Sequence, residues 1–338
     1  MIAAGAAEVA DIRVGNMQAI AVYAGEELVW EAVPLGPPYL TFSSPSAFTL
    51  ATANETKNWD GVIEYSTNKS TWIEWDGTEI ASLSVGAKHR LYLRGKNNHI
   101  ITGNVSANAF VLSGSQIKCD GDIRTLLDYD NMDDASMDDY CFAHLFQSCS
   151  ALIKAPDLPL TTLTVGCYTF MFFGCGLIET PSLPATVLQQ GCYSHMFESC
   201  QALTEAPLLP AMSVPQSAYF GMFSSCYSLV RSPRLPATTV GKTCYDQMFE
   251  GCRNLETIPR LPALVLADMC YLYMFSGCSK IKMSEVQTGE YVNEYRIPAS
   301  GTGQNANRAT WFMFGHTGGT FTGNPTVNTM YYTSNLVI

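Results

Sequence analysis

One string of about 26 residues recurs six times between residues 140 and 283, and this repetition constrains the fold more than any other feature. With x for a variable residue, it reads roughly C-Y-x-x-M-F-x-x-C-x-x-L-x-x-x-P-x-L-P-A-T-x-L. Its phenylalanine position holds Phe146, Phe172, Phe197, Phe223, Phe249 and Phe275, and its second cysteine position holds Cys149, Cys175, Cys200, Cys226, Cys252 and Cys278. A unit this short cannot bury its own apolar face, so successive units stack as a solenoid. We therefore predict that these phenylalanines and cysteines form the core.

The two halves of each copy predict different local structures. In C-Y-x-x-M-F-x-x-C the apolar residues fall at i, i+1, i+4, i+5 and i+8, which predicts a short helix with one buried stripe. The L-x-x-x-P-x-L-P half holds two prolines three residues apart, which no helix interior tolerates. This half is expected to be extended, with a short strand around its first leucine. One strand and one short helix per roughly 20–29 residues is the plan of a leucine-rich repeat.

The repeat resembles the BspA-like leucine-rich repeats of gut-bacterial surface proteins and of proteins from their phages and prophages. The resemblance rests on the Cys-Tyr-x-x-Met-Phe-x-x-Cys-x-x-Leu strings and on Leu-Pro-Ala-Thr strings such as residues 235–238. It implies a scaffold for adhesion or recognition whose ligand varies from protein to protein. A shorter string, V-Y-x-G-x-x-x-V-W at residues 22–30, looks like segments of phage structural proteins and prophage-encoded surface proteins.

Two β-rich regions are predicted ahead of the repeats. Residues 1–33 hold short β-rich runs broken by Gly15-Asn16 and Gly25-Glu26, which predict a small β-meander that serves as an attachment segment. The prolines of residues 33–38 predict a stiff linker. Residues 39–118 contain short runs of aromatic and branched residues separated by Asn, Gly and Ser clusters, which predict a β-sandwich.

The rest of the chain, residues 119–338, is predicted to form a leucine-rich-repeat solenoid with a cap at each end. Met313-Phe314 lies one and a half periods after Met274-Phe275, which predicts an inserted loop followed by a degenerate last turn. The tail segments 330–333 and 336–338 are expected to cover the C-terminal edge. The predicted fold class is mixed β and α/β.

Eleven of the twelve cysteines fall in the repeat register, and Cys119 is the exception. The two cysteines of one copy, such as Cys192 and Cys200, would lie about 12 Å apart along a helix, beyond the roughly 7 Å Cα separation that a disulfide spans. Ala218 replaces the first cysteine in one copy, which indicates a position that needs a small buried residue. We expect reduced thiols, and no spacing predicts a zinc site or a cofactor.

The charge of the chain argues against two classes of binding partner. The net charge of −11 argues against nucleic acid and anionic membrane surfaces, and no run of apolar residues is long enough to span a membrane. Acidic residues gather between residues 120 and 139, which predicts a solvated loop ahead of the repeats. The alternative is a calcium site, since Asp128-x-Asp130 begins like an EF-hand loop. Met132 and Asp133 stand where that loop needs an oxygen ligand and a glycine.

Positions that vary among the copies define a candidate binding face. Beside the predicted strands, the charged members of this face are Lys154, Glu179, Glu205, Arg231 and Glu256. Variation on a regular frame suits recognition of an extended partner, and the alternative is unselected drift on a solvated face. His144 and His195 share one variable position and are expected to point outward. No serine-hydrolase, zinc-protease or nucleotide-binding motif is present, so no enzyme activity is expected.

These observations favour a phage or prophage virion protein that decorates the particle or binds a receptor. The N-terminal region would contact other virion proteins, and the solenoid would contact a protein or glycan of the host surface. Residues 1–10 carry no basic segment of a secretory signal, as expected for a protein assembled in the host cytoplasm. The alternatives are a bacterial cell-surface adhesin and a cytoplasmic protein-binding scaffold. A homo-oligomer is possible, although no heptad pattern supports a coiled coil.

Overall fold

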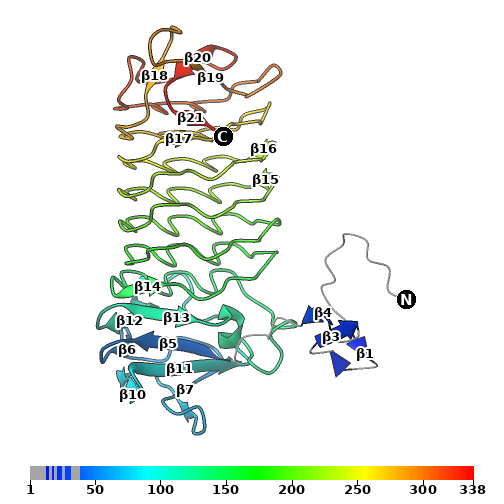
Figure 1. The fold of residues 1–338 in the computed structure, drawn as a ribbon, viewed down its shortest axis with the longest axis vertical. Coiled ribbons are helices and arrows are strands. Elements are labelled where there is room, and N and C mark those ends of the chain that lie inside the picture. Colours follow the sequence, from blue (N-terminus) through cyan, green and yellow to red (C-terminus); the bar gives the residue numbers. More distant parts are fainter. Residues whose placement is uncertain (1–12, 15–16, 19–20, 25–26, 32–38) are drawn as a thin grey trace. The chain divides into compact units, whose positions relative to one another are not determined.

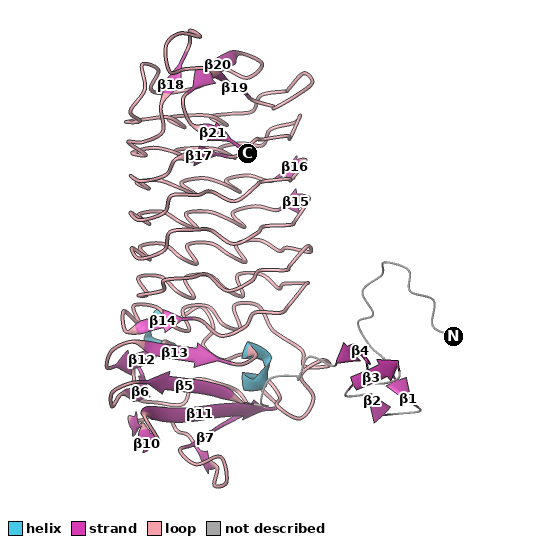
Figure 2. Cartoon of the chain, in the orientation of Figure 1, coloured by secondary structure: helices cyan, strands magenta, loops and turns pink. Residues whose placement is uncertain are grey.

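The computed structural model describes residues 39–338 in full and the backbone of residues 13–14, 17–18, 21–24 and 27–31. The chain divides into two compact units, Met1–Pro37 and Pro38–Ile338, and each is described by itself. Short strands joined by turns dominate the described residues (Figure 1), and their two helices are short 3-10 segments, η1 (Ser106–Asn108) and η2 (Ile123–Leu126) (Figure 2). The fold is therefore β-rich, with several small sheets.

The described residues of the first unit form two antiparallel pairs of strands. β1 (Arg13–Val14) pairs with β2 (Met17–Gln18), and β3 (Ala21–Ala24) pairs with β4 (Glu27–Glu31). The predicted turn signals at residues 15–16 and 25–26 and the predicted linker at 33–38 lie outside the described residues.

Two sheets form the first part of the second unit. Their strands are β5 (Leu40–Ser44), β6 (Thr49–Thr52), β7 (Val62–Ser66), β8 (Ile73–Glu74), β9 (Ile80–Ala81), β10 (Leu83–Val85), β11 (Lys88–Lys96), β12 (Phe110–Ser113), β13 (Ile117–Asp120) and β14 (Leu152–Lys154). The larger sheet has the order β14-β13-β5-β11-β7-β8 with β10 also on β11, and the smaller has the order β12-β6-β9. Alternating residues such as Leu91, Leu93, Leu50 and Leu112 are buried in one core shared by both sheets.

The predicted boundary between residues 118 and 119 falls inside a sheet. β13 pairs antiparallel with β5 and parallel with β14, so it joins the first sheet directly to the first repeat copy. Phe42 of β5 and Phe110 of β12 both contact the ring of Phe146, at centroid distances of 6.2 and 5.9 Å. The residues of 39–118 therefore cover the first copy and belong to the same compact unit as the repeats.

The predicted short helix in each copy is wrong, because this segment forms a series of tight turns (Figure 2). In the second copy a positive φ recurs every four residues, at Gly166, Phe170 and Gly174, and a helix cannot continue through such residues. Backbone N–H groups alternate between two acceptors. The N–H of Met171 donates to Tyr168 in its own copy, whereas the N–H of Phe172 donates to Met196 of the next copy.

Successive copies lie on one another through a continuous column of aromatic rings. Neighbouring rings of the column are 5.5–5.8 Å apart and within 10° of parallel from Phe146 through Phe172, Phe197, Phe223, Phe249 and Phe275 to Phe314. These seven side chains have no exposed surface. Phe314 ends the column, and its ring meets Tyr295 and Phe321 edge-on at the C-terminal end. The phenylalanine positions predicted as core are therefore buried and in contact.

The thiol of the second cysteine in each copy donates a hydrogen bond to a buried backbone carbonyl. The six thiols donate to the phenylalanine carbonyl of the preceding layer at 2.9–3.1 Å, from Cys149 to Phe110 and then from Cys175, Cys200, Cys226, Cys252 and Cys278 to the phenylalanine of the previous copy. The repeat pattern predicted that these cysteines lie in the core, but not that they form hydrogen bonds. Their S–H groups explain why the position is polar and small, because an unpaired buried carbonyl is costly.

All twelve cysteines are free and buried, which leads to a chemical prediction. Burial raises the pKa of Cys200 and of Cys192 to about 12, so almost no thiolate forms at pH 8. We expect the native protein to resist iodoacetamide at pH 8, and all twelve thiols to react once guanidinium unfolds the chain. Mass spectrometry after a short pulse of reagent measures this difference. Rapid labelling of several thiols in the native protein would contradict the assigned interior.

The proline-rich half of each copy is extended, with short parallel pairings between copies. Its strands are β14, β15 (Ser213–Val214), β16 (Thr239–Val240) and β17 (Thr257–Ile258). β15 pairs in parallel with β16, and Leu209, Leu235 and Leu261 of the Leu-Pro pairs are buried. The leucine of each of these Leu-Pro pairs therefore belongs to a second layer of the core.

Of the two tail strands predicted to cover the C-terminal edge, one lies at that end and the other inserts between two copies. Its strands are β18 (Met283–Ser284), β19 (Asn293–Arg296), β20 (Met330–Thr333) and β21 (Leu336–Val337). β20 pairs antiparallel with β18 and β19, but β21 pairs in parallel with β17 of the fifth copy (Figure 1). The last residues thus lie beside the strand positions of the repeats.

Candidate recognition surface

The predicted binding residues form a charged column along successive copies, with one exception. Lys154, Glu179, Glu205 and Arg231 each lie two residues after the buried leucine of their copy. Lys154 pairs with Asp120 at 2.5 Å, and Arg231 lies 3.8 Å from Glu205, across a backbone bridge between the same two residues. The side chains of Glu205 and Arg231 are about 70% exposed, so their attraction contributes little to stability and both stay accessible.

Glu256 does not belong to this charged column. It lies one position earlier in its copy, directly after Leu255, and pairs with Lys280 at 2.7 Å. The column position is taken instead by Thr257, which is buried and bonded to Ser232. The charged column therefore ends at Arg231. Glu256 is exposed and stays a candidate member of the variable face, one position away from the column.

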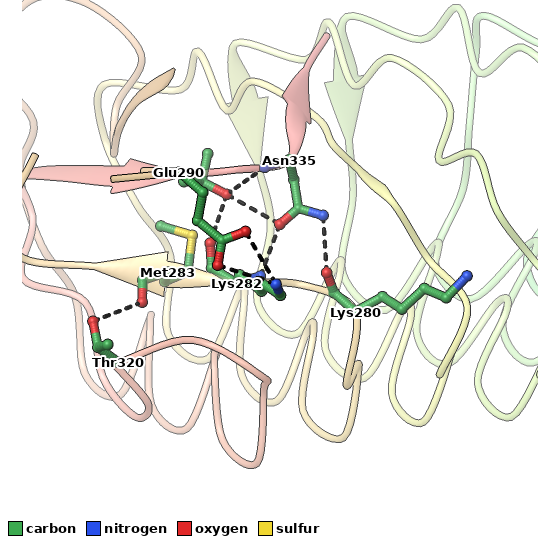
Figure 3. A network of polar contacts seen from close by, with 7 residues as sticks. Lys280, Lys282, Met283, Glu290, Thr320 and Asn335 are labelled. Atoms are coloured by element: carbon green, nitrogen blue, oxygen red, sulfur yellow. Dashed lines mark hydrogen bonds and ion pairs between the residues drawn. The ribbon is translucent and has the colours of Figure 1, made fainter. Parts of the chain in front are cut away.

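Just beyond Arg231, the side chain of an asparagine lies between two copies whose backbones would otherwise bond directly. Earlier copies bond directly, as in the N–H of Glu256 to the carbonyl of Val230 at 2.9 Å. At the next copy the Asn335 amide intervenes, accepting from the N–H of Lys282 at 2.7 Å and donating to the carbonyl of Lys280 at 3.0 Å (Figure 3). It also donates to the carbonyl of Glu256 at 3.1 Å. No local motif indicates this role, because it depends on a contact across 53 residues of sequence.

Two adjoining grooves flank the inserted β21. The larger, of about 620 Å³, is lined by Arg231, Ser232, Glu256, Asn335 and Leu336 among others. The smaller, of about 440 Å³, lies over the proline-rich half of the copies and has a mostly apolar floor. Ile338 borders both grooves. The charged column thus runs into a concave region formed by the C-terminal segment.

A stack of aromatic rings lies on the turns of the repeats. The rings of His144, Phe170 and His195 stack face to face, at centroid distances of 5.1 and 4.5 Å. The Nδ1 of His195 bonds to Glu198 at 2.5 Å, and that of His144 bonds to Gln147 at 2.6 Å. The expectation that both histidines point outward is wrong, because each ring is largely covered by the neighbouring copies.

Asp246 is a buried carboxylate that the repeat pattern did not indicate. It is 6% exposed, and its Oδ1 has no hydrogen-bond partner among the described residues. Burial, followed by the nearby charge of Glu250, raises the pKa of Asp246 to about 7. Burial and the charge of Glu198 likewise raise the pKa of Glu250. These acids gather because Glu198 and Glu250 occupy one position in copies three and five.

The raised pKa of Asp246 predicts a pH-dependent stability. Between the ordinary aspartate pKa of 3.8 and about 7 the folded state holds a proton that the unfolded state has lost, so stability falls as pH rises through this range. Asp246→Asn should therefore raise the free energy of unfolding at pH 8 by on the order of 2 kcal/mol and flatten the slope between pH 4 and 7. Urea unfolding at several pH values measures both effects, and identical profiles for variant and parent would contradict the burial.

No family model, curated protein or solved structure matches this chain. Its own residues therefore have to indicate its function.

Part of the acidic stretch at residues 120–139 forms ion pairs. Arg124 pairs with Asp122 at 2.7 Å and with Asp133 at 2.8 Å, and Lys96 pairs with Asp130 at 2.6 Å. Among the residues that the structure describes, no group of three acidic, His or Cys side chains is arranged to hold a metal ion. None of the described helices is long and apolar enough to cross a membrane.

Proposed function

We propose that the repeat copies form a leucine-rich-repeat solenoid that acts as a non-enzymatic recognition scaffold. The exposed charged column on an otherwise uniform stack carries this proposal. Core positions hold the same residue types from copy to copy, whereas the column changes from Lys154 to Glu179, Glu205 and Arg231. A rigid frame with varied exposed side chains at a fixed spacing suits an extended ligand that contacts several copies at once.

The scaffold is proposed to be a virion component of a phage or prophage, with a host-surface protein or glycan as its ligand. The resemblance of the repeats and of residues 22–30 to proteins of phages and prophages supports this setting. The N-terminal unit, separate from the repeats, would then attach the protein to other virion proteins. A cell-surface adhesin would use the same column and differ only in where the N-terminal unit is anchored.

Removal of the column charges should weaken binding without loss of stability. We expect Glu205→Ala with Arg231→Ala to reduce binding of the purified chain to intact host bacteria about tenfold. The free energy of unfolding should change by less than about 0.5 kcal/mol, because both side chains are exposed. Arg253→Ala is the matched control, since this exposed arginine lies outside the column and packs on Tyr227. Equal binding by the double variant and the parent would contradict the proposal.

A further inference from the structure

The residue that follows the first proline of each copy changes from acidic to basic along the stack. This position holds Asp157, Ser182, Leu208, Arg234 and Arg260 in successive copies. The two arginines therefore lie in adjacent copies at the C-terminal end. In a chain of net charge −11, two neighbouring cations at one repeated position mark a local reversal of charge.

Both arginines line the smaller groove and are exposed. Among the described residues, neither guanidinium forms an ion pair or a hydrogen bond. By contrast, Arg94 and Arg124 are both paired with carboxylates. A guanidinium presents a planar fork of donors that matches a carboxylate or a sulfate, so an unpaired arginine pair in a groove favours an anionic ligand.

The floor of the groove is apolar, and two of its residues are prolines. It is formed by Leu235, Pro236, Pro262 and Val337, and the prolines have no N–H to donate. At its border, the N–H of Ile338 donates to Ile258 and its carbonyl oxygen accepts from the N–H of Arg260, at 3.0 and 2.8 Å. The prolines cannot donate to the backbone of a peptide strand, whereas the C–H face of a sugar ring needs only an apolar surface.

We infer that the groove beside Arg234 and Arg260 binds an acidic polysaccharide, with the two guanidiniums on the carboxylate or sulfate groups of neighbouring sugars. The apolar floor contacts the sugar rings. The inference rests on the proposed recognition function and names the class of ligand.

Binding of labelled polysaccharides tests the inference. Fluorescent polygalacturonate carries carboxylates, dextran sulfate carries sulfates, and neutral dextran carries neither. The full chain should bind at least one of the two acidic polymers and not neutral dextran, and the stronger acidic binder identifies the anionic group. Arg234→Gln with Arg260→Gln should lower the affinity at least about tenfold, since each charged hydrogen bond contributes on that order. Arg253→Gln, with the same charge change as one of these substitutions, should stay within about twofold.

Three results would overturn the inference: unchanged affinity of the double variant, equal binding of neutral dextran, or equally tight binding of polyglutamate. Binding to intact bacteria separates this failure from failure of the proposed function. If Glu205→Ala with Arg231→Ala loses cell binding while Arg234→Gln with Arg260→Gln keeps it, the groove assignment is wrong and the recognition function stands. If the parent chain binds no bacteria, the recognition function itself is contradicted.

Discussion

Phe223→Ala is expected to lower the free energy of unfolding by about 3–5 kcal/mol, the usual cost of removing a fully buried phenylalanine. The ring has no exposed surface and stacks on Phe197 at 5.5 Å and on Phe249 at 5.8 Å. Alanine would leave a cavity in the middle of the column. It would also remove the ring contacts that the fourth copy makes with copies three and five. Urea unfolding followed by tryptophan fluorescence measures the change.

Leu208→Ala is the matched control for this prediction. Leu208 belongs to the same stack but is 79% exposed, so its truncation should change the free energy of unfolding by less than about 0.5 kcal/mol. In a stack where each copy contacts only its neighbours, the loss at Phe223 should also reduce the cooperativity of unfolding. A Phe223 variant as stable as the parent would mean that the inner and outer faces of the repeats are assigned the wrong way round.

Asn335→Ala should cost about 2–4 kcal/mol, because it leaves several backbone groups without partners at once. The amide holds the N–H of Lys282 and the carbonyls of Glu256 and Lys280, and its oxygen also accepts from the Thr333 hydroxyl at 3.1 Å. Its loss should free the C-terminal segment from the fifth copy. Hydrogen exchange of the β21 amides, measured beside urea unfolding, detects this local opening.

The control for this variant is Asn254→Ala. Asn254 also bridges two copies, through a single exposed bond from its Nδ2 to the carbonyl of Tyr227 at 2.9 Å. Its removal should change stability only slightly, since water can replace the bond. Equal and small effects at Asn254 and Asn335 would show that the C-terminal segment is held by β-strand pairing alone.

The repeat period made the core predictable from the sequence alone. A phenylalanine that recurs at a constant spacing must lie at the same place in every copy, and stacking of the copies then brings the rings together. The Met-Phe pair of the motif also located Phe314 in the last turn, despite the long insertion before it. The Leu-Pro half was predictable because proline excludes the helix and leaves extended backbone.

The turns in the C-Y-x-x-M-F-x-x-C half of each copy were mispredicted as a helix, because the spacing of its apolar residues is close to the helical period. The pattern i, i+1, i+4, i+5 and i+8 has a period of four residues, whereas a helix has a period of about 3.6. Over nine residues the two differ little. The positive φ values at Phe170, His195 and Gln247 decide in favour of turns. In the sequence, only glycines at positive-φ positions indicated this, such as Gly221 at the equivalent position of its copy.

Contacts between residues that are far apart in the sequence could not be predicted. Asn335 and β21 belong to no repeat, so their place beside the fifth copy depends on how the chain returns from the insertion. The groove with Arg234 and Arg260 is completed by that return, since Val337 and Ile338 line it. By contrast, the charged column from Lys154 to Arg231 followed from the repeat alignment alone, with Glu256 one position beside it.

Immunogold electron microscopy would decide whether the protein is a virion component. Antibody to residues 140–283 is applied to a phage-induced lysate and to intact producing cells. We expect gold on virus particles, at the tail or capsid, and little on the cell surface. Gold on intact cells without particles would contradict the virion assignment and favour an adhesin, and gold confined to the cell interior would favour a cytoplasmic scaffold.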